Sequence, residues 1–256
     1  MDFPTALRGH RSRRRLSQLD LALRAGTTQR HLSFIESGRS VPGRDMVVRL
    51  AESLELPLRE RNDLLLTAGY APAYPQSGLD SGRLAPVLTA LTHILTGHQP
   101  YPALVIDRRG DLVAANDAFG LLTAGASADL LRPPLNVYRL ALHPQGLAPR
   151  IANFAEWARH VLDGLRRETL RNPDAALAEL LTELQSYVPD QEPGGDHLGF
   201  AVPLRLSSPG GELRLMTTIS TFATAVDVTV AELRLEAFLP ADEETAALLA
   251  GSASAR

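Results

Sequence analysis

Apolar residues recur at helical spacing through residues 5–70, in five short runs separated by tight turns. Ser17 is placed to cap the second run, Gly26 ends it, and Thr28 is placed to cap the third. The expected inward-facing residues are Leu19, Ala22 and Leu23 in the second run, Leu32 and Ile35 in the third, and Met46, Val47, Leu50 and Leu54 in the fourth. The pattern predicts a domain of five helices over residues 5–70.

Residues 71–82, "APAYPQSGLDSG", lack this periodicity and are rich in proline, glycine and serine. Such a composition is typical of a linker between domains. A chain of 256 residues is long enough for two modest domains. We therefore expect a linker here and a second domain over residues 83–240.

The second domain mixes helical and strand patterns. A helix near 84–97 precedes two apolar runs around "RRGD", which predict a β-hairpin, and Asn116 is placed to cap the helix that follows. Helical spacing returns over 149–187, with a break at "NP", and three strands are expected in "LGFAVPLRL", "GELRLMTTISTF" and "DVTVAELRLEAFL". The order predicts an α+β fold with a five-stranded antiparallel sheet and helices on one face. Residues 241–256 are expected to form a disordered tail.

The second and third helices have the spacing of a helix-turn-helix. Ala22 is small where the helices must approach, and Gly26 permits the positive φ of the turn. The residues that then face outward near the start of the third helix are Gln29, Arg30, Ser33 and Phe34. This part of a recognition helix reaches base edges, where glutamine pairs with adenine, arginine with guanine, and an aromatic ring packs on a thymine methyl. The alternative is a helical bundle that binds no nucleic acid.

Charge separates the two predicted domains. Residues 1–70 contain 12 arginines against 8 aspartates and glutamates, whereas the whole chain has a net charge of -3. A basic domain on an acidic one favours contact with phosphates, although a solvated basic surface would give the same balance. Cysteine is absent, which excludes thiolate chemistry and suits a reducing cytoplasm. No apolar run approaches the ~20 residues that span a bilayer, so we expect a cytoplasmic protein without membrane contact.

The stretch "LSQLDLALRAGTTQRHLSFIESGRSVPGRDMVVRLAESLEL" resembles the Xre-type (Cro/cI) helix-turn-helix regulators. The resemblance covers roughly residues 5–65 and implies that Gln29, Arg30 and Phe34 read bases. The residues for which it implies phosphate contacts are Gln18, Thr28, Arg39 and Arg44. Phe34 departs from the family, in which an amide or a basic residue is commoner, so an apolar or shape-based contact is expected there. His31 either contacts phosphate or is solvated.

The segment "VIDRRGDLVAANDAF" is similar to the start of PAS domains. Together with "LPLRERNDLLLTAGYAP", "NVYRLALHPQGLAPRIANFAEWA" and "TISTFATAVDVTVAELRLEAFLPAD", it makes nearly the whole chain resemble the MmyB-like regulators. This resemblance implies an Xre-type DNA-binding domain joined to a PAS-related domain that holds a small acyl-type ligand. It also implies a link with antibiotic and fatty-acid metabolism.

Large apolar side chains of the second domain either line a ligand cavity or fill the core. They are Phe119, Leu122, Tyr138, Phe154, Trp157, Phe200, Met216 and Phe222. Arg139 lies among apolar residues in "NVYRLALHP". There it would hold a ligand carboxylate or pair with an internal aspartate or glutamate.

No pattern indicates an enzyme. A Gly-rich phosphate loop and a nucleophile elbow are absent, the histidines lack metal-ligand spacing, and neither a cofactor nor a metal is expected. The sequence therefore predicts a homodimeric transcription regulator that binds double-stranded DNA and responds to a small apolar ligand. The alternative is a DNA-binding regulator whose second domain only dimerises or recruits a partner, without a ligand.

Overall fold

The chain divides into two compact units in the computed structural model, which describes residues 2–171, 173–188 and 201–254. The first unit comprises Met1–Ser81 and Ala223–Ala231, and the second comprises Gly82–Phe222 and Glu232–Arg256. Sequence periodicity predicts no role in the first unit for Ala223–Ala231, which lies deep within the range expected for the second domain.

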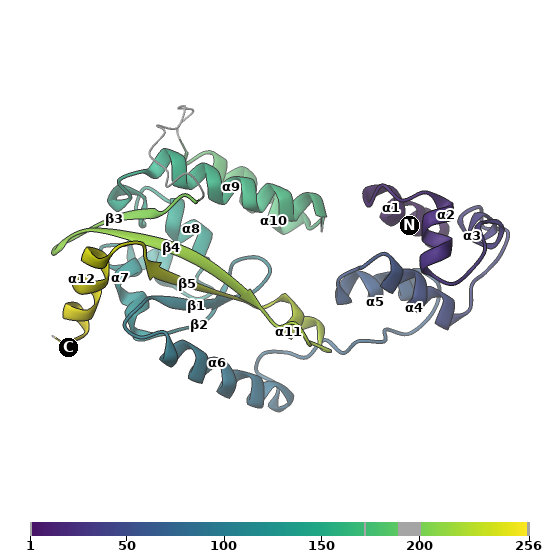
Figure 1. Cartoon of the computed structure of the whole chain (residues 1–256), viewed down its shortest axis with the longest axis horizontal. Helices are drawn as coiled ribbons and strands as arrows, with labels where there is room; N and C mark the ends of the chain where they lie inside the picture. The colour runs from purple at the N-terminus through teal and green to yellow at the C-terminus, as the bar shows by residue number, and fades with distance from the viewer. Residues whose placement is uncertain (1, 172, 189–200, 255–256) are drawn as a thin grey trace. The chain divides into compact units, whose positions relative to one another are not determined.

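Five helices build the N-terminal part of the first unit (Figure 1), which confirms the predicted helical domain. They are α1 (Phe3–Arg13), α2 (Gln18–Arg24), α3 (Gln29–Glu36), α4 (Arg44–Ser53) and α5 (Leu58–Thr67). Their apolar faces meet in one core that includes Leu7, Leu21, Leu32, Leu50 and Leu65.

Helix α2 turns a different face inward from the one expected. Its start is fixed by a capping box, in which Asp20 N–H donates to Ser17 Oγ (3.1 Å) and Ser17 N–H donates to Asp20 Oδ2 (3.0 Å). In this phase Leu21 is fully buried, whereas Leu19 and Leu23 are 48% and 69% exposed. The expectation that Leu19 and Leu23 form the inner stripe is therefore wrong.

The second unit is built on one antiparallel sheet, which confirms the five-stranded prediction. Its order is β2-β1-β5-β4-β3, with β1 (Ala103–Ile106), β2 (Leu112–Ala115), β3 (Leu204–Ser208), β4 (Gly211–Thr221) and β5 (Arg234–Pro240). Glu236 of the central strand lies opposite Leu104 on one side and Ile219 on the other. These three side chains therefore share one face of the sheet.

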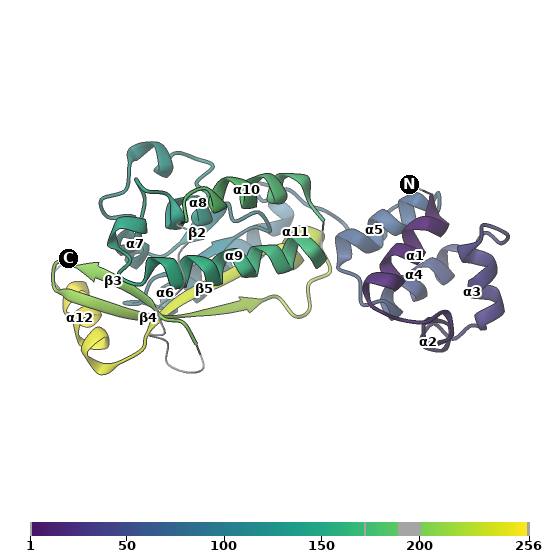
Figure 2. The same ribbon diagram turned by 90° about the horizontal axis from the view of Figure 1, so that it is seen from above.

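Helices cover both faces of the sheet, not the single face that was expected (Figures 1 and 2). One face carries α6 (Ala85–Gly97) and α12 (Glu243–Ser254). The other carries α7 (Gly120–Thr123), α8 (Val137–Leu142), α9 (Phe154–Arg171) and α10 (Ala175–Gln185), of which α9 and α10 lie side by side. Alternating burial along a strand shows only that a side chain is covered, so it cannot tell which element covers it.

The C-terminal residues differ from the expected disordered tail, because α12 packs on β4. Asp242 caps the helix by accepting from Thr245 N–H (2.8 Å). The buried Thr245 hydroxyl accepts from Arg214 N–H (3.0 Å), and Leu249 is buried as well. The alanine-rich C-terminal segment therefore forms a helix, which a few buried side chains hold against the sheet.

Asn116 precedes a short helix as predicted, but its side chain does not cap that helix. Instead, the buried amide joins α6 to the start of β1. Its Oδ1 accepts from Ala103 N–H (3.0 Å), and its Nδ2 donates to the carbonyls of Leu95 (3.1 Å) and Tyr101 (2.8 Å). Asn116 thus satisfies backbone groups at a buried corner where strand and helix meet.

The residues expected to form a linker are held against the first unit. Asn62 of α5 accepts from the N–H groups of Ala73 and Tyr74 (both 3.0 Å) and donates to the Tyr74 carbonyl (2.7 Å). The side chain of Asn62 is buried inside this set of bonds. The start of the segment 71–82 is therefore anchored to α5.

A loop from between β4 and β5 holds the next part of this segment. It contains α11 (Val228–Glu232), where a strand was expected, and Asp227 caps α11 by accepting from Thr229 N–H (2.9 Å). Asp227 also accepts from Ser77 N–H (3.1 Å), the Thr229 hydroxyl donates to the Ser77 carbonyl (2.8 Å), and Val228 N–H donates to the Pro75 carbonyl (2.8 Å). We call these bonds between 75–77 and 227–229 the linker clasp.

Candidate DNA interface and ligand cavity

Helix α3 has the geometry of a recognition helix. Thr28 Oγ1 caps it by accepting from His31 N–H (3.1 Å), and the preceding turn places Gly26 at φ 62°. Leu32 and Ile35 are fully buried, which confirms the predicted inner face. The opposite face, near the start of α3, carries the exposed Gln29 and Arg30 and the half-buried Ser33 and Phe34.

Arg30 and Phe34 lie one helical turn apart and contact each other. The Arg30 guanidinium carbon lies 5.5 Å from the centre of the Phe34 ring. Such a cation–π contact stabilises the extended side chain and leaves the guanidinium edge free for hydrogen bonds. The ring therefore supports the arginine, a role that the sequence does not predict for Phe34.

A buried carboxylate ties α3 to α1 and α2. Glu36, at 2% exposure, accepts from Arg11 Nε (2.7 Å) and Nη2 (2.9 Å) and from Gln18 Nε2 (2.8 Å). Burial alone would raise the pKa of Glu36, but the bonds from Arg11 and Gln18 and the nearby arginine charges outweigh it, and the pKa is lowered. Glu36 is thus ionised and links the recognition helix to α1 and α2.

The basic side chains around α3 lie on the surface. Arg39 follows α3 and Arg44 opens α4, and both are exposed. His31 is half-buried, with its Nδ1 3.0 Å from the Thr27 hydroxyl. This contact holds the imidazole against the turn, so His31 is not a fully solvated side chain.

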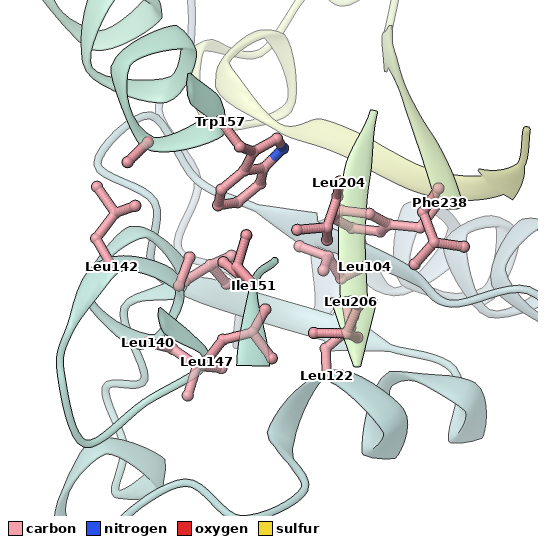
Figure 3. Close-up of a cluster of buried hydrophobic side chains, with 14 of the residues drawn as sticks. Leu104, Leu122, Leu140, Leu142, Leu147, Ile151, Trp157, Leu204, Leu206 and Phe238 are labelled. Carbon is pink, nitrogen blue, oxygen red and sulfur yellow. The ribbon is translucent and has the colours of Figure 1, made fainter. Parts of the chain in front are cut away.

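A cavity of about 320 Å³ lies in the second unit, between the sheet and helices α7, α8 and α9. Figure 3 shows Trp157 reaching from α9 toward Leu204 of β3. Apolar residues dominate the walls, and those drawn there are Leu104, Leu122, Leu140, Leu147, Trp157, Leu204 and Phe238. A concave and mostly apolar site with few polar groups is typical of small-molecule binding.

Two polar side chains that face this cavity are shielded from solvent, the partly buried Tyr138 and the buried Glu236. Burial raises the pKa of Tyr138 to about 12, so that its hydroxyl stays protonated. Burial also raises the pKa of Glu236, although the charge of Arg234 beside it acts in the opposite direction. Beside its apolar residues, the cavity wall thus contains a phenol and a carboxyl group whose charged forms are disfavoured by burial. The wall also includes His160, Arg167, Glu168, Thr217 and Arg234.

The hairpin turn between β1 and β2 positions Tyr138. Gly110 lies at φ 87°, and a Cβ atom there would come within 2.3 Å of the Tyr138 ring. Only glycine lets the ring lie this close to the turn, so the "RRGD" motif shapes one side of the cavity.

A second hollow of about 480 Å³ lies on the opposite face of the sheet, between α6, β2 and α12. Its walls include Thr92, Thr96, Gln99, Asn116 and Asp117. These residues make it more polar than the cavity beneath α9.

Comparison with known families also divides the chain in two, although the match to the second part includes Ala223–Ala231, which belongs to the first compact unit. A family model described as "MmyB-like transcription regulator ligand binding domain" matches residues 87–250. The chain belongs to the MmyB-like transcription regulators. A second model, for a helix-turn-helix domain, matches residues 6–69 of this regulator. No curated protein matches the chain.

The matched domains make this MmyB-like chain a DNA-binding transcription regulator with a ligand-binding domain. Across residues 2–171, 173–188 and 201–254, no helix is long and apolar enough to cross a membrane. The same ranges hold no group of three histidines, aspartates or glutamates arranged to bind a metal.

The aromatic and apolar residues predicted for a ligand cavity are divided in the MmyB-like regulator. Phe119, Leu122, Tyr138 and Trp157 line the cavity beneath α9. Phe154, Met216 and Phe222 are not on its wall, and Phe154 packs on the core instead. Phe200 lies outside the described residues.

Arg139 is also absent from the cavity wall. Its Nε and Nη2 donate to the two carboxylate oxygens of Glu183 in α10, at 2.6 and 2.7 Å. Hydrogen bonds from Arg139 lower the pKa of Glu183, so both partners are charged. The geometry favours the internal ion pair over a ligand anchor. The pair forms because α10, which carries Glu183, packs against α8, which carries Arg139.

Sequence reasoning missed Glu36 and Glu236. Glu36 sits in "SFIESGR" at the helical position after the buried Ile35, which is a weak signal for a paired carboxylate. Glu236 lies two residues from both Arg234 and Phe238 in "RLEAF". Because side chains two apart in a strand point to the same face, Glu236 shares the face of Phe238. The period of a strand could have found Glu236, but not the cavity it faces.

Proposed function

We propose that this regulator binds its operator as a homodimer in the cytoplasm, and that a small apolar, acyl-type molecule in the cavity beneath α9 controls its DNA binding. The observation that carries the proposal is the largely apolar cavity within a domain of the MmyB-like ligand-binding family. Regulator families of this kind are generally non-enzymatic, and the proposal includes no catalytic step.

The proposed base-reading residues are Gln29, Arg30, Ser33 and Phe34. The exposure of Arg30 and its support by Phe34 favour a bidentate bond to guanine. Phosphate contacts are proposed for Gln18, Thr28, Arg39 and Arg44. Gln18 already donates to Glu36 through Nε2, so a phosphate contact by its side chain would compete with that bond.

The proposed homodimer follows from the small size of the reading surface. One helix-turn-helix contacts only a few base pairs, so two copies are needed for useful affinity. A two-fold dimer would read half-sites about one helical turn, ~34 Å, apart. The acidic second domain would supply the dimer contacts, because the basic surface of the first is used on phosphates.

An acyl-type chain fits the chemistry of the cavity walls. Each methylene that leaves water for an apolar site contributes about 0.8 kcal/mol, so a chain can bind without many polar contacts. The pairing of Arg139 with Glu183 argues against Arg139 as a carboxylate anchor. The proposal therefore leaves Arg139 out of the ligand site.

Selections of randomised operators test the DNA-binding part. Arg30→Ala should cost about 1–3 kcal/mol on the preferred site and relax the choice at one base pair. Arg44→Ala is the matched control, because it should weaken all sequences alike and reduce the salt dependence. An unchanged selected sequence with Arg30→Ala would refute the base-reading role.

Native mass spectrometry of the purified dimer, before and after denaturing extraction, tests the ligand-binding part. A bound molecule of a few hundred daltons that dissociates on unfolding supports the sensor. Titration with decyl compounds, followed through Trp157 on the cavity wall, gives an independent measurement. If neither method detects a ligand, the second domain only dimerises or recruits a partner.

A further inference from the structure

The second half of β4 is a free edge of the sheet. β3 pairs with β4 only over Gly211–Leu215, whereas β5 pairs with β4 as far as Thr221. In Figure 2, β4 runs on past the end of β3. Among the residues that the structure describes, 216–221 therefore have a neighbouring strand on one side alone.

The register shows which backbone groups face this edge. Phe238 N–H donates to a carbonyl just before β1 (2.8 Å), so the backbone groups of its neighbour Ala237 point the other way, toward β4. Thr218 lies opposite Ala237, and its N–H and C=O groups face β5. Because this direction alternates along a strand, the groups of residues 217, 219 and 221 face the free edge.

This edge lacks the features that keep natural strand edges from pairing. Its sequence, "MTTIST", has no charged residue and no proline. Residues 217–221 are exposed, and Ile219 is 60% exposed. A row of unpaired N–H and C=O groups is a template for another strand unless charge, proline, a bulge or a covering segment protects it. The edge is therefore suited to pair with a strand of another molecule.

We infer that the homodimer forms here, by antiparallel pairing of β4 with β4 of a second copy. In a register centred on Ile219, that residue faces its own counterpart, and Thr217 faces Thr221 of the second copy. All three residues whose backbone groups face outward then lie in hydrogen-bonded pairs. This inference rests on the proposed homodimer and names its contact surface.

A second copy fits this edge because the segment is complementary to itself. The centred register joins isoleucine to isoleucine and threonine to threonine, and cross-strand pairs of this kind stabilise neighbouring strands. A two-fold dimer uses the same patch on both copies, which this register provides. Two acidic domains repel each other, and an uncharged strand lets them approach without placing like charges opposite one another. Pairing would also cover Ile219, an exposed apolar residue of the ligand cavity wall.

Hydrogen exchange of the wild-type full chain tests the pairing without any substitution. Sedimentation first gives the dimer dissociation constant, and exchange is then read at single residues by mass spectrometry below and above that concentration. The amides of residues 217, 219 and 221 should exchange at least about tenfold more slowly in the dimer. Those of residues 218 and 220 face β5 and should be protected at both concentrations.

Opposite charges at the centre of the strand test the register. Ile219→Lys and Ile219→Asp should each weaken the dimer at least about tenfold, because like charges would face each other across the two-fold axis. An equimolar mixture of the two variants should recover the wild-type dissociation constant to within about threefold. Ile94→Lys is the matched control, since Ile94 is also exposed but lies on α6, and it should change the constant by less than about twofold. Melting followed through Trp157 verifies that each variant folds.

The outcomes separate the inference from the proposed function. A wild type that stays monomeric at every concentration removes the homodimer and the inference together. A stable dimer in which residues 217, 219 and 221 exchange as fast as in the monomer keeps the homodimer and overturns the inference. Protection of the same amides in the monomer would overturn it too, because the chain itself would then cover the edge. A mixture of folded lysine and aspartate variants that pairs no better than either alone would also overturn it.

Discussion

Replacing Glu36 by glutamine should destabilise the DNA-binding unit far more than a surface substitution does. The change keeps the shape of the side chain but removes its charge from a site with 2% exposure. Arg11 then faces a neutral amide, and one of its two short bonds loses its acceptor. Gln18 Nε2 also donates to Glu36 Oε2, the oxygen shared with Arg11.

The size of the effect follows from these bonds. Hydrogen bonds to charged groups contribute about 1.5–3 kcal/mol each, and breaking a buried ion pair typically costs about 3–5 kcal/mol. The side chain of Arg11 is 15% exposed and regains some hydration, so we expect a loss of about 3 kcal/mol. In a domain of this size that corresponds to a fall of roughly 12–24 °C in melting temperature.

Two spectroscopic signals of the full chain separate the units. Far-UV circular dichroism follows the helices of both, whereas the single tryptophan, Trp157, reports only on the ligand-binding unit. Glu36→Gln should move the helical signal to lower temperature and leave the Trp157 transition in place. Glu52→Gln is the matched control, because its 3.8 Å ion pair with Arg61 is half exposed and should change stability by less than about 0.5 kcal/mol. Equal effects of the two variants would refute the reasoning.

Further expectations concern pH and two other buried sites. The pKa of Glu36 is lowered in the fold, so its contribution is complete above the unfolded value of about 4.3 and is lost as the pH falls through the folded value. The melting difference between wild type and Glu36→Gln should therefore shrink in acid. Gly110→Ala forces a Cβ atom against Tyr138 and should lower the Trp157 melting temperature much more than Gly125→Ala, where φ is also positive but the space is open. Asn116→Ala leaves three backbone groups unpaired and should cost about 2–4 kcal/mol in urea titrations, with Asn116→Asp intermediate.

Local signals in the sequence predict much of the fold. The caps at Ser17 and Thr28, the turn at Gly26 and the strand alternation act within a few residues, and each is present in the structure. The pattern does not predict which face of α2 is buried, because Leu19 and Leu23 repeat at helical spacing as regularly as the residues that are buried. A stripe shows that a helix is amphipathic, but the side that turns inward is decided by packing, here by Leu21, Ala22 and Ala25 in the core.

The sites depend on contacts that sequence spacing does not encode. Arg139 and Glu183 are joined because α10 returns to α8, and the Glu36 network brings three helices together. The residues near Asp227 read as a strand because valine and threonine favour one, yet a capped helix forms there. The cavity itself results from the volumes that α8, α9 and the sheet leave unfilled, and no single segment carries that information.

The linker clasp has a consequence for how such regulators can be recombined. The DNA-binding unit is completed by a segment, Ala223–Ala231, that the chain reaches only after crossing four strands. A chimaera spliced once near residue 82 would combine residues 75–77 of one protein with residues 227–229 of another. Bonds such as that from Ser77 to Asp227 would then have to form between residues of different parents. Exchange of the DNA-binding unit between relatives therefore needs two crossovers, one near each of the two segments that form the linker clasp. We expect functional chimaeras to take residues 75–77 and 227–229 from the same parent.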